Sequence, residues 1–240
     1  MSSPQRFSKG VTNVTSDKTM GQLIVPDPTS VHMLMDDFNK FIPDDWFITR
    51  VHTGGTAGAE TVGDADGGEL AFYPANADDD STFFQYKSTA NVSSASEIFT
   101  LASGKKLWFK SRLKISDTGD SDFIIGLQSA DTMPTTSPVN SILFRSDDGD
   151  DYLDFQVYAA SVSTLSDTAL ATLVDNTYFT IGFYFDGVDT LHYFYNDQEV
   201  GSSQSFTYPT AEMTLSFGVQ NGSATARTMS IDYICCIKER

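Results

Sequence analysis

Hydrophobic and polar residues alternate in short runs along most of this chain from Asp36 onward. Within Lys106–Ile115, Leu107 and Phe109 fall on one side of an extended chain and Trp108 falls on the other. Because successive side chains of a β-strand point to opposite faces of its sheet, this pattern predicts a strand with one buried and one solvated side. Clusters of Gly, Asp, Asn, Ser and Pro separate further runs of this kind, at Phe123–Leu127, Leu153–Val157 and Phe179–Phe185.

The C-terminal part of the sequence predicts a hairpin and two further strands. Leu191–Tyr195 is followed by Asn196 and Asp197, which tolerate the left-handed backbone of a tight turn. The last strands are expected at Leu215–Val219 and Thr228–Ile237. About a dozen strand candidates and almost no helical pattern are too many strands for one open sheet. We therefore predict an all-β fold, a two-sheet antiparallel jelly-roll sandwich.

The N-terminal residues follow neither the strand nor the helix rhythm, and they end in the stiff, extended segment Val25-Pro26-Asp27-Pro28. We predict that residues 1–34 form an extended arm and that residues 35–240 form the sandwich domain. A tail without fixed structure is the alternative. Scattered apolar residues of the arm can fill pockets on another subunit: Phe7, Val11, Val14, Leu23, Ile24 and Val25.

The charge of the chain excludes several partners. Its formal net charge is −17, so it would repel nucleic acid and anionic membranes, which bind proteins through Lys and Arg. Three basic and two acidic residues give the arm a charge of +1, which leaves −18 on the body. Such acidity also suits a marine or halotolerant source. The start lacks the apolar core of a secretory signal, which predicts synthesis in the cytoplasm.

The sequence predicts no catalytic residue, no cofactor site and no metal site. Retaining glucanases need two carboxylates that project together from one strand, and neither Glu-x-Asp-x-Glu nor Glu-x-Asp-x-x-Glu occurs here. The histidines His32, His52 and His192 are isolated, and the adjacent Cys235 and Cys236 are expected to be reduced thiols. Structural calcium is an open alternative for the acidic loops at Asp78–Asp80, Asp117–Asp122 and Asp147–Asp151.

Carbohydrate binding is a second open alternative, because it needs exposed aromatic rings with polar groups around them. The candidate rings are Trp46, Trp108, Tyr158, Tyr184 and Tyr193. Three sequons, at Asn13, Asn91 and Asn221, are interpreted as chance matches in a chain rich in Ser and Thr.

Several segments together resemble a known family. The order Met35–Phe38, Ser121–Gln128, Phe144–Asp150, Phe217–Val219 and Ile231–Tyr233 resembles the concanavalin A-like domain of tailed-phage virion proteins. Gly10–Thr15 and Val25–Pro28 also resemble the leader that precedes this domain in marine phage structural proteins. The resemblance implies a capsid decoration (cement) protein without catalysis or cofactor.

On this basis we expect a non-catalytic protein that binds the outside of the major capsid shell and stabilises it. The expected partner is the phage major capsid protein, contacted through the arm residues Phe7, Val11, Val14, Leu23, Ile24, Val25 and Pro26. A homo-oligomer, either dimer or trimer, is expected because icosahedral shells offer two-fold and three-fold positions. The alternative is a carbohydrate-binding virion module for attachment to host or other glycans.

Overall fold

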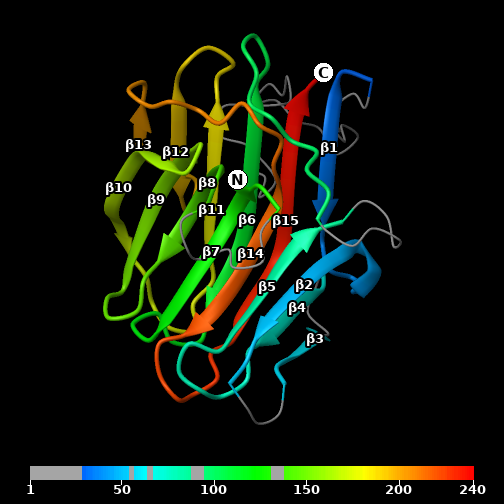
Figure 1. The fold of residues 1–240 in the computed structure, drawn as a ribbon, viewed down its shortest axis with the longest axis vertical. Coiled ribbons are helices and arrows are strands. Elements are labelled where there is room, and N and C mark those ends of the chain that lie inside the picture. Colours follow the sequence, from blue (N-terminus) through cyan, green and yellow to red (C-terminus); the bar gives the residue numbers. More distant parts are fainter. Residues whose placement is uncertain (1–28, 54–56, 64–66, 88–94, 131–137) are drawn as a thin grey trace, which may run out of the picture.

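The computed structural model describes residues 29–53, 57–63, 67–87, 95–130 and 138–240. In these ranges fifteen β-strands form two antiparallel sheets (Figure 1), and the single helical element is the short 3-10 helix η1 (Pro43–Asp45). No helix in the described part of the chain is long and apolar enough to cross a membrane. The all-β, two-sheet antiparallel fold predicted from the alternating pattern is confirmed.

The first sheet, sheet A, has eight strands. Their order is β13 (Gln198–Ser203), β12 (Leu191–Tyr195), β11 (Phe179–Phe185), β6 (Leu107–Ile115), β15 (Met229–Glu239), β4 (Glu69–Tyr73) and β3 (Ala59–Gly63). The eighth strand, β1 (Val31–Asp36), also pairs with β15, beside residues 234–239, whereas β4 pairs with residues 229–231. The pairing of β15 with β6 shifts register between Ile231 and Tyr233.

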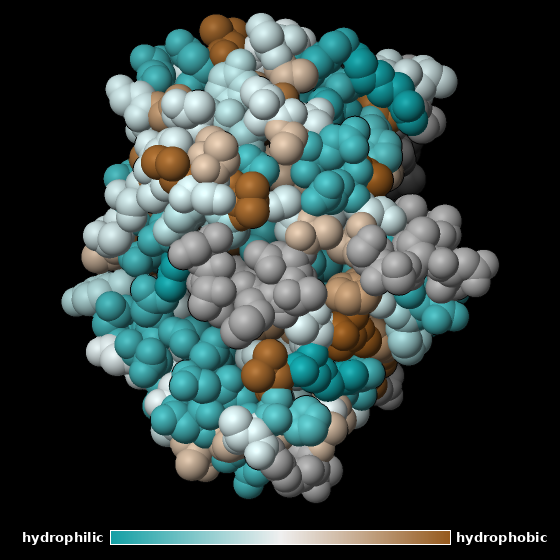
Figure 2. Space-filling model, viewed as in Figure 1, coloured by the Kyte–Doolittle hydropathy of each residue, from teal (hydrophilic) through white to brown (hydrophobic). Residues whose placement is uncertain are grey.

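The second sheet, sheet B, has seven strands. Their order is β10 (Val162–Thr172), β9 (Tyr152–Ala159), β8 (Ser141–Ser146), β7 (Ser121–Gln128), β14 (Thr214–Asn221), β5 (Ser81–Tyr86) and β2 (Trp46–Val51). Figure 2 shows the molecule from the side of this sheet. Hydrophilic residues dominate the coloured surface there, and strongly hydrophobic residues appear only as separate small patches.

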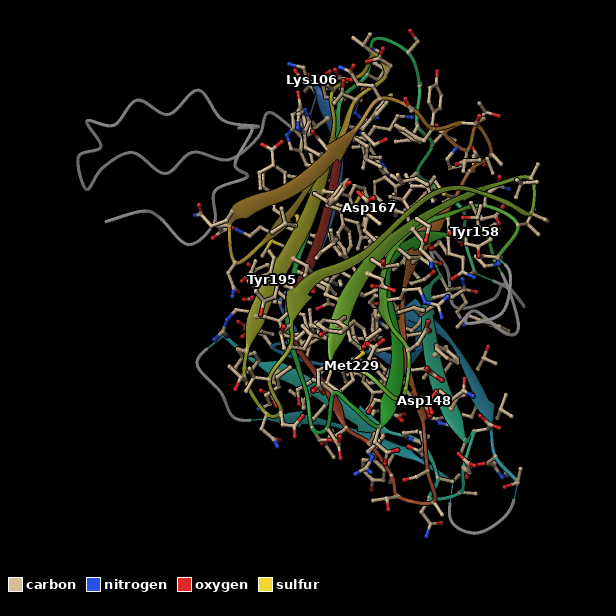
Figure 3. The ribbon with its side chains drawn as sticks, turned by 90° about the vertical axis from the view of Figure 1, so that its left-hand side faces the viewer. Lys106, Asp148, Tyr158, Asp167, Tyr195 and Met229 are labelled. Atoms are coloured by element: carbon tan, nitrogen blue, oxygen red, sulfur yellow. The ribbon has the colours of Figure 1, made fainter. Side chains whose placement is uncertain are left out.

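Phenylalanine rings fill the space between the sheets. Phe84 of sheet B stacks on Phe217 with ring centroids 5.0 Å apart, and Phe72 of sheet A meets Phe84 edge-on at 4.6 Å. Burial of each such side chain stabilises the fold by roughly 1.5–3 kcal/mol. In the edge-on view of Figure 3, Met229 lies between the layers, Tyr195 lies on the side of sheet A and Tyr158 on the side of sheet B.

The alternation rule places most strands correctly, because one face of each is buried in this core. The hairpin also forms as predicted: Asn196 and Asp197 have φ angles of 48° and 63° and join β12 to β13. Left-handed backbone is tolerated by Asn and Asp better than by most residues, which explains why these two stand at the turn.

The beginning of the sandwich differs from the expected boundary. Val31–Leu34 lie within the predicted arm, but they form the first part of β1, where Val31 pairs with Glu239 and Leu34 pairs with Cys236. Hydrophobic residues stand on both faces of this strand, so the contrast between alternate positions that marks a strand is absent. The paired body therefore begins at Val31.

Candidate functional site

The outer face of sheet B, which points away from sheet A, is apolar at its centre. Phe83, Ile124 and Leu143 form a cluster there with only 2 to 4% of each side chain exposed. The Phe83 ring lies against Gly218, where any Cβ atom would collide with the ring. A glycine at this position thus lets an aromatic ring lie flat on the sheet.

Polar side chains surround this apolar centre. Towards one end, Gln85 donates from its Nε2 to Ser216 Oγ at 2.9 Å and to the carbonyl oxygen of Ser129 at 3.2 Å. Towards the other end, Arg145 forms an ion pair with Asp147, and the Asp148 N–H donates to Asp122 Oδ1 at 2.7 Å. Burial raises the pKa of Asp122, although the hydrogen bond from Asp148 acts in the opposite direction. These polar groups are engaged with one another and with the backbone.

The central strands of this face present few carboxylates. The outward positions of β7 are Asp122, Ile124, Gly126 and Gln128, and β8 presents Leu143 between Ser141 and Arg145. Hydrolysis of a glycosidic bond with retention of the anomeric configuration needs two carboxyl groups about 5–5.5 Å apart. On the described strands β7 and β8, Asp122 is the one outward carboxylate, and Ile124, Gly126 and Leu143 stand at the central outward positions.

No protein-family model matches the sequence, and no curated protein matches it. Solved structures match the fold. A protein of unknown function from Shewanella oneidensis gives a TM-score of 0.58 at 13% identity, covering 92% of this chain and 97% of that one. The carbohydrate recognition domain of Emp47p gives 0.59 at 13% identity, covering 88% and 97%. A glycoside hydrolase family 16 endo-glucanase from Bacteroides ovatus gives 0.57 at 15% identity, covering 84% and 98%.

The fold is a concanavalin A-like jelly roll. The sequence resemblance predicted this fold, and the structural matches confirm it. Identities of 13 to 15% extend the likeness to the fold and no further. Structures with this fold include a carbohydrate recognition domain and a glucanase, so the fold alone does not determine the function of this chain.

The five candidate rings for carbohydrate binding lie in three parts of the structure: the core, the outer face of sheet A and the outer face of sheet B. Trp46 and Tyr193 are buried in the core between the sheets, so neither can stack on a sugar. Trp108 and Tyr184 project from the outer face of sheet A. Of the five, Tyr158 stands on the outer face of sheet B, where it is half-buried. The sequence pattern therefore does not produce one aromatic platform.

The outer face of sheet A carries a second apolar cluster, which we call the outer cluster: Val31, Trp108, Tyr184, Phe194, Cys235 and Ile237. Aromatic rings stack across this face: the Trp108 and Tyr184 ring centroids are 5.5 Å apart, and the Tyr184 and His192 centroids are 5.7 Å apart. Beside them Lys110 is buried and its Nζ lies 2.5 Å from Asp197 Oδ1. The prediction of a solvated side for this part of β6 is therefore wrong.

Further along β6 the outer face becomes polar. Arg112 pairs with Asp232 at 2.6 Å, and Lys114 pairs with Glu69 at 3.2 Å. Both cations lie over the Tyr178 ring, with Arg112 Cζ 4.0 Å from its centroid. The charges of Arg112 and Lys114 are therefore paired within the sheet.

The histidines and cysteines show no arrangement for chemistry. His32 packs edge-on against Phe99 at 5.0 Å, and His192 Nδ1 lies 2.7 Å from Glu199 Oε1. No group of three or more His, Cys, Asp or Glu side chains in the described ranges could hold a metal ion. Cys235 and Cys236 are free thiols, and burial raises the pKa of Cys235 to about 12, so this thiol is a poor nucleophile.

The acidic loop Asp117–Asp122, at one end of the sandwich, is held by Arg227, a residue that no sequence motif marks. Its guanidinium forms ion pairs with Asp117 and Asp120. Hydrogen bonds from Ser223 and Arg227 lower the pKa of Asp120. The Arg227 guanidinium thus supplies positive charge to two carboxylates of this loop.

Asn221 belongs to the same end of the sandwich and is fully buried. Its Nδ2 donates to the carbonyl oxygens of Ala75 and Ala77, and its Oδ1 accepts from the Arg227 N–H. An amide engaged in this way cannot carry a glycan in the folded protein. The sequons at Asn13 and Asn91 and all seven predicted arm contacts, from Phe7 to Pro26, lie outside the described residues.

Proposed function

We propose that this chain is a non-catalytic structural protein that decorates the outer surface of a phage capsid. One observation carries the proposal: the paired body begins at the molecular surface, where the Arg240 N–H donates to the Ser30 carbonyl oxygen at 3.0 Å. Residues 1–28 therefore precede a body whose two sheets run from Val31 to Glu239. A segment added to such a body is suited to reach a second protein.

Charge supports the same arrangement. The arm carries +1 and the body −18, so the body resists close association with other acidic surfaces while the arm does not. The proposed partner is the major capsid protein, and the proposed location is the capsid exterior after synthesis in a bacterial cytoplasm. Occupation of symmetry axes on the shell calls for a homodimer or homotrimer.

The outer face of sheet B supports a non-catalytic role. Its central outward positions on β7 and β8 are Ile124, Gly126 and Leu143, none of which is a carboxylate. A decoration protein stabilises a shell by burying surface between neighbouring subunits, and it needs no catalytic group. In this proposal the jelly roll and the arm together provide that surface.

Replacement of three apolar arm residues in full-length protein, Phe7→Ser, Val11→Ser and Val14→Ser, tests the proposal. Each large apolar side chain buried in a contact contributes about 1.5–3 kcal/mol, so we expect capsid affinity to fall by more than about a hundredfold. Undecorated heads are mixed with each protein and sedimented, and the bound amounts are compared.

The matched control removes three exposed valines of the body instead, Val162→Ser, Val174→Ser and Val188→Ser. It should bind as the natural protein does. Equal sedimentation of the arm variant and the natural protein would contradict the assignment of the arm. Absence of binding by the natural protein would contradict the decoration role itself.

Carbohydrate binding is the second candidate, and one observation favours it. Tyr152 and Tyr158 both project outward from β9, with Gln156 between them on the same face of sheet B. If glycans bind there, Tyr158→Ala should weaken binding by about tenfold, since one aromatic contact contributes on the order of 1 kcal/mol or more.

Calorimetry with laminarin and a panel of bacterial surface glycans measures this effect. Tyr73→Ala, which removes an exposed ring from sheet A, serves as the control. The copy number in purified virions then separates the two candidates, because decoration requires a number comparable with that of the capsid protein.

A further inference from the structure

The strand β1 stands at an open edge of sheet A. In the described ranges β1 pairs with β15 and with no other strand, and Figure 1 shows it at the margin of the sandwich beside β15. Its outward side chains Met33 and Met35 are 44% and 45% exposed. An edge strand with exposed apolar side chains is a template for pairing with another chain.

The other edge strands carry features that hinder such pairing. The pairing of β10 with β9 shifts register twice, and the pairing of β12 with β13 shifts once. The edge strands β2 and β3 are joined to each other by the ion pair of Arg50 and Glu60. In contrast, β1 pairs with β15 without a shift, and Val31–Met35 contain no Asp, Glu, Lys, Arg or Pro. Because bulges and charges block edge-to-edge pairing, their absence marks β1 as the edge that is open to a partner.

The hydrogen-bond pattern shows which residues of β1 face this edge. Opposed residues of an antiparallel pair alternate between those that exchange backbone hydrogen bonds and those that do not. The Arg240 N–H donates to the Ser30 carbonyl oxygen at 3.0 Å, so the even-numbered residues of β1 bond to β15. The backbone groups of Val31, Met33 and Met35 therefore point to the open edge. Since Arg240 Nε donates to the Val31 carbonyl oxygen at 2.9 Å, the two methionines are the residues that present backbone groups to a partner strand.

We propose that this edge pairs with the β1 edge of a second copy of the chain, antiparallel and centred on Leu34, to form a two-fold symmetric dimer. Two such strands can bond only where the backbone groups of opposed residues face each other. With the centre at Leu34, Met33 of each copy lies opposite Met35 of the other, and all of these groups meet. The same edge is used by both copies, so the assembly closes at two.

The chemistry of the strand selects a second copy as the partner. In this register the segment His32–Asp36 is complementary to itself. Leu34 meets its own equivalent on one face, and the methionines of the two copies meet on the other. At each end His32 lies opposite Asp36 of the second copy, so a basic side chain faces an acidic one. Apolar and opposite-charge pairs across strands both stabilise a sheet.

Sedimentation velocity of the isolated full-length protein tests the interface. In Met33→Lys with Met35→Lys, two lysines lie opposite each other in both cross-strand pairs, so we expect the Kd of the dimer to rise by about a hundredfold or more. In Met33→Lys with Met35→Glu, each lysine lies opposite a glutamate, so we expect the dimer to be retained. The matched control, Val162→Lys with Val174→Lys, adds two lysines at exposed positions elsewhere and should sediment as the natural protein does.

Disulfide formation tests the register. The Leu34 positions of the two copies form a pair without backbone hydrogen bonds, with Cα atoms about 4.5 Å apart, a separation that a disulfide can span. Leu34→Cys should therefore give a covalent dimer under mild oxidation. Met33→Cys, which lies opposite Met35 of the second copy, should remain largely uncrosslinked. The natural protein, with Cys235 and Cys236 buried, serves as the blank.

Sedimentation of the natural protein as a monomer or a trimer would overturn the dimer. So would a dimer that the paired lysines leave intact, or one that the lysine and glutamate together fail to retain. If a charged variant loses its circular dichroism spectrum, the cross-linking of Leu34→Cys decides. The dimer goes beyond the proposed function, and these experiments contain no capsids. A dimer that does not bind heads would contradict decoration alone, and a monomer that binds heads would contradict the interface alone.

Discussion

Phe217→Ala should destabilise the jelly roll by about 3–5 kcal/mol, the usual cost of removing a buried phenylalanine side chain. Phe217 lies on β14 in the interior of sheet B and is fully buried. Its ring stacks on Phe84 and meets Trp46 at 4.9 Å and Phe72 at 5.6 Å. Truncation therefore leaves a cavity surrounded by rigid rings that cannot easily move into it.

Thermal unfolding followed by circular dichroism measures this effect. For a chain of this size, each 1 kcal/mol lowers Tm by about 2–4 °C, so we expect a decrease of about 6–20 °C. Tyr152→Ala removes an aromatic ring that is 46% exposed, and it should change the free energy of unfolding by less than about 0.5 kcal/mol. A loss below about 1 kcal/mol for Phe217→Ala would mean that this ring cluster is not the centre of the core.

The alternating pattern predicted the strands that contribute one face to this core. Leu153, Phe155 and Val157 of β9 are buried, while the residues between them are partly exposed, which is the pattern the sequence suggested. Such strands are recognisable because burial on one side and solvent on the other select different residue types.

The strands that the pattern misjudged have unusual surroundings on their outer face. In β6, Trp108 and Lys110 alternate with buried residues and were expected to be solvated, but both are buried. Alternation identifies two faces, and it does not tell whether a second segment covers the outer one. The large apolar Trp108 on a face otherwise rich in lysine and arginine was the available signal.

The candidate sites were less predictable than the strands, because sites depend on contacts between residues distant in sequence. Trp46 and Tyr193 were reasonable ring candidates, yet both point between the sheets. Arg227 pairs with Asp117 and Asp120, and no local spacing relates an arginine to carboxylates more than a hundred residues earlier in the chain. Only the register of the sheets brings these groups together.

Asp80→Ala should destabilise the protein by about 3 kcal/mol through lost hydrogen bonds. The Asp80 side chain is fully buried at the start of β5, next to Ser81. Its Oδ1 accepts from the Thr53 N–H at 2.8 Å, and its Oδ2 accepts from the Ala77 N–H at 2.9 Å. Alanine would leave both backbone donors without this partner, and a buried donor left unsatisfied costs about 1–3 kcal/mol.

The pH dependence of stability identifies the charged form of Asp80 as the stabilising one. Burial acts to raise the pKa of Asp80, but the hydrogen bonds from Ala77 and Thr53 outweigh it, so the folded pKa lies below the ordinary value of 3.8. A carboxyl group with a lowered folded pKa stabilises the protein fully above its unfolded pKa. That stabilisation is lost as the pH falls through the folded pKa.

Urea unfolding of the natural protein and of Asp80→Asn over a range of pH measures the effect of this carboxylate alone. The difference in unfolding free energy should be constant well above pH 3.8 and should shrink as the pH falls below that value. Asp44→Asn removes the same charge from an exposed position of η1 and serves as the control, with a smaller expected difference in unfolding free energy. The difference in unfolding free energy between the natural protein and Asp80→Asn could instead stay constant as the pH falls below 3.8. That result would show that the ionised carboxylate of Asp80 does not stabilise the fold through its hydrogen bonds to Thr53 and Ala77.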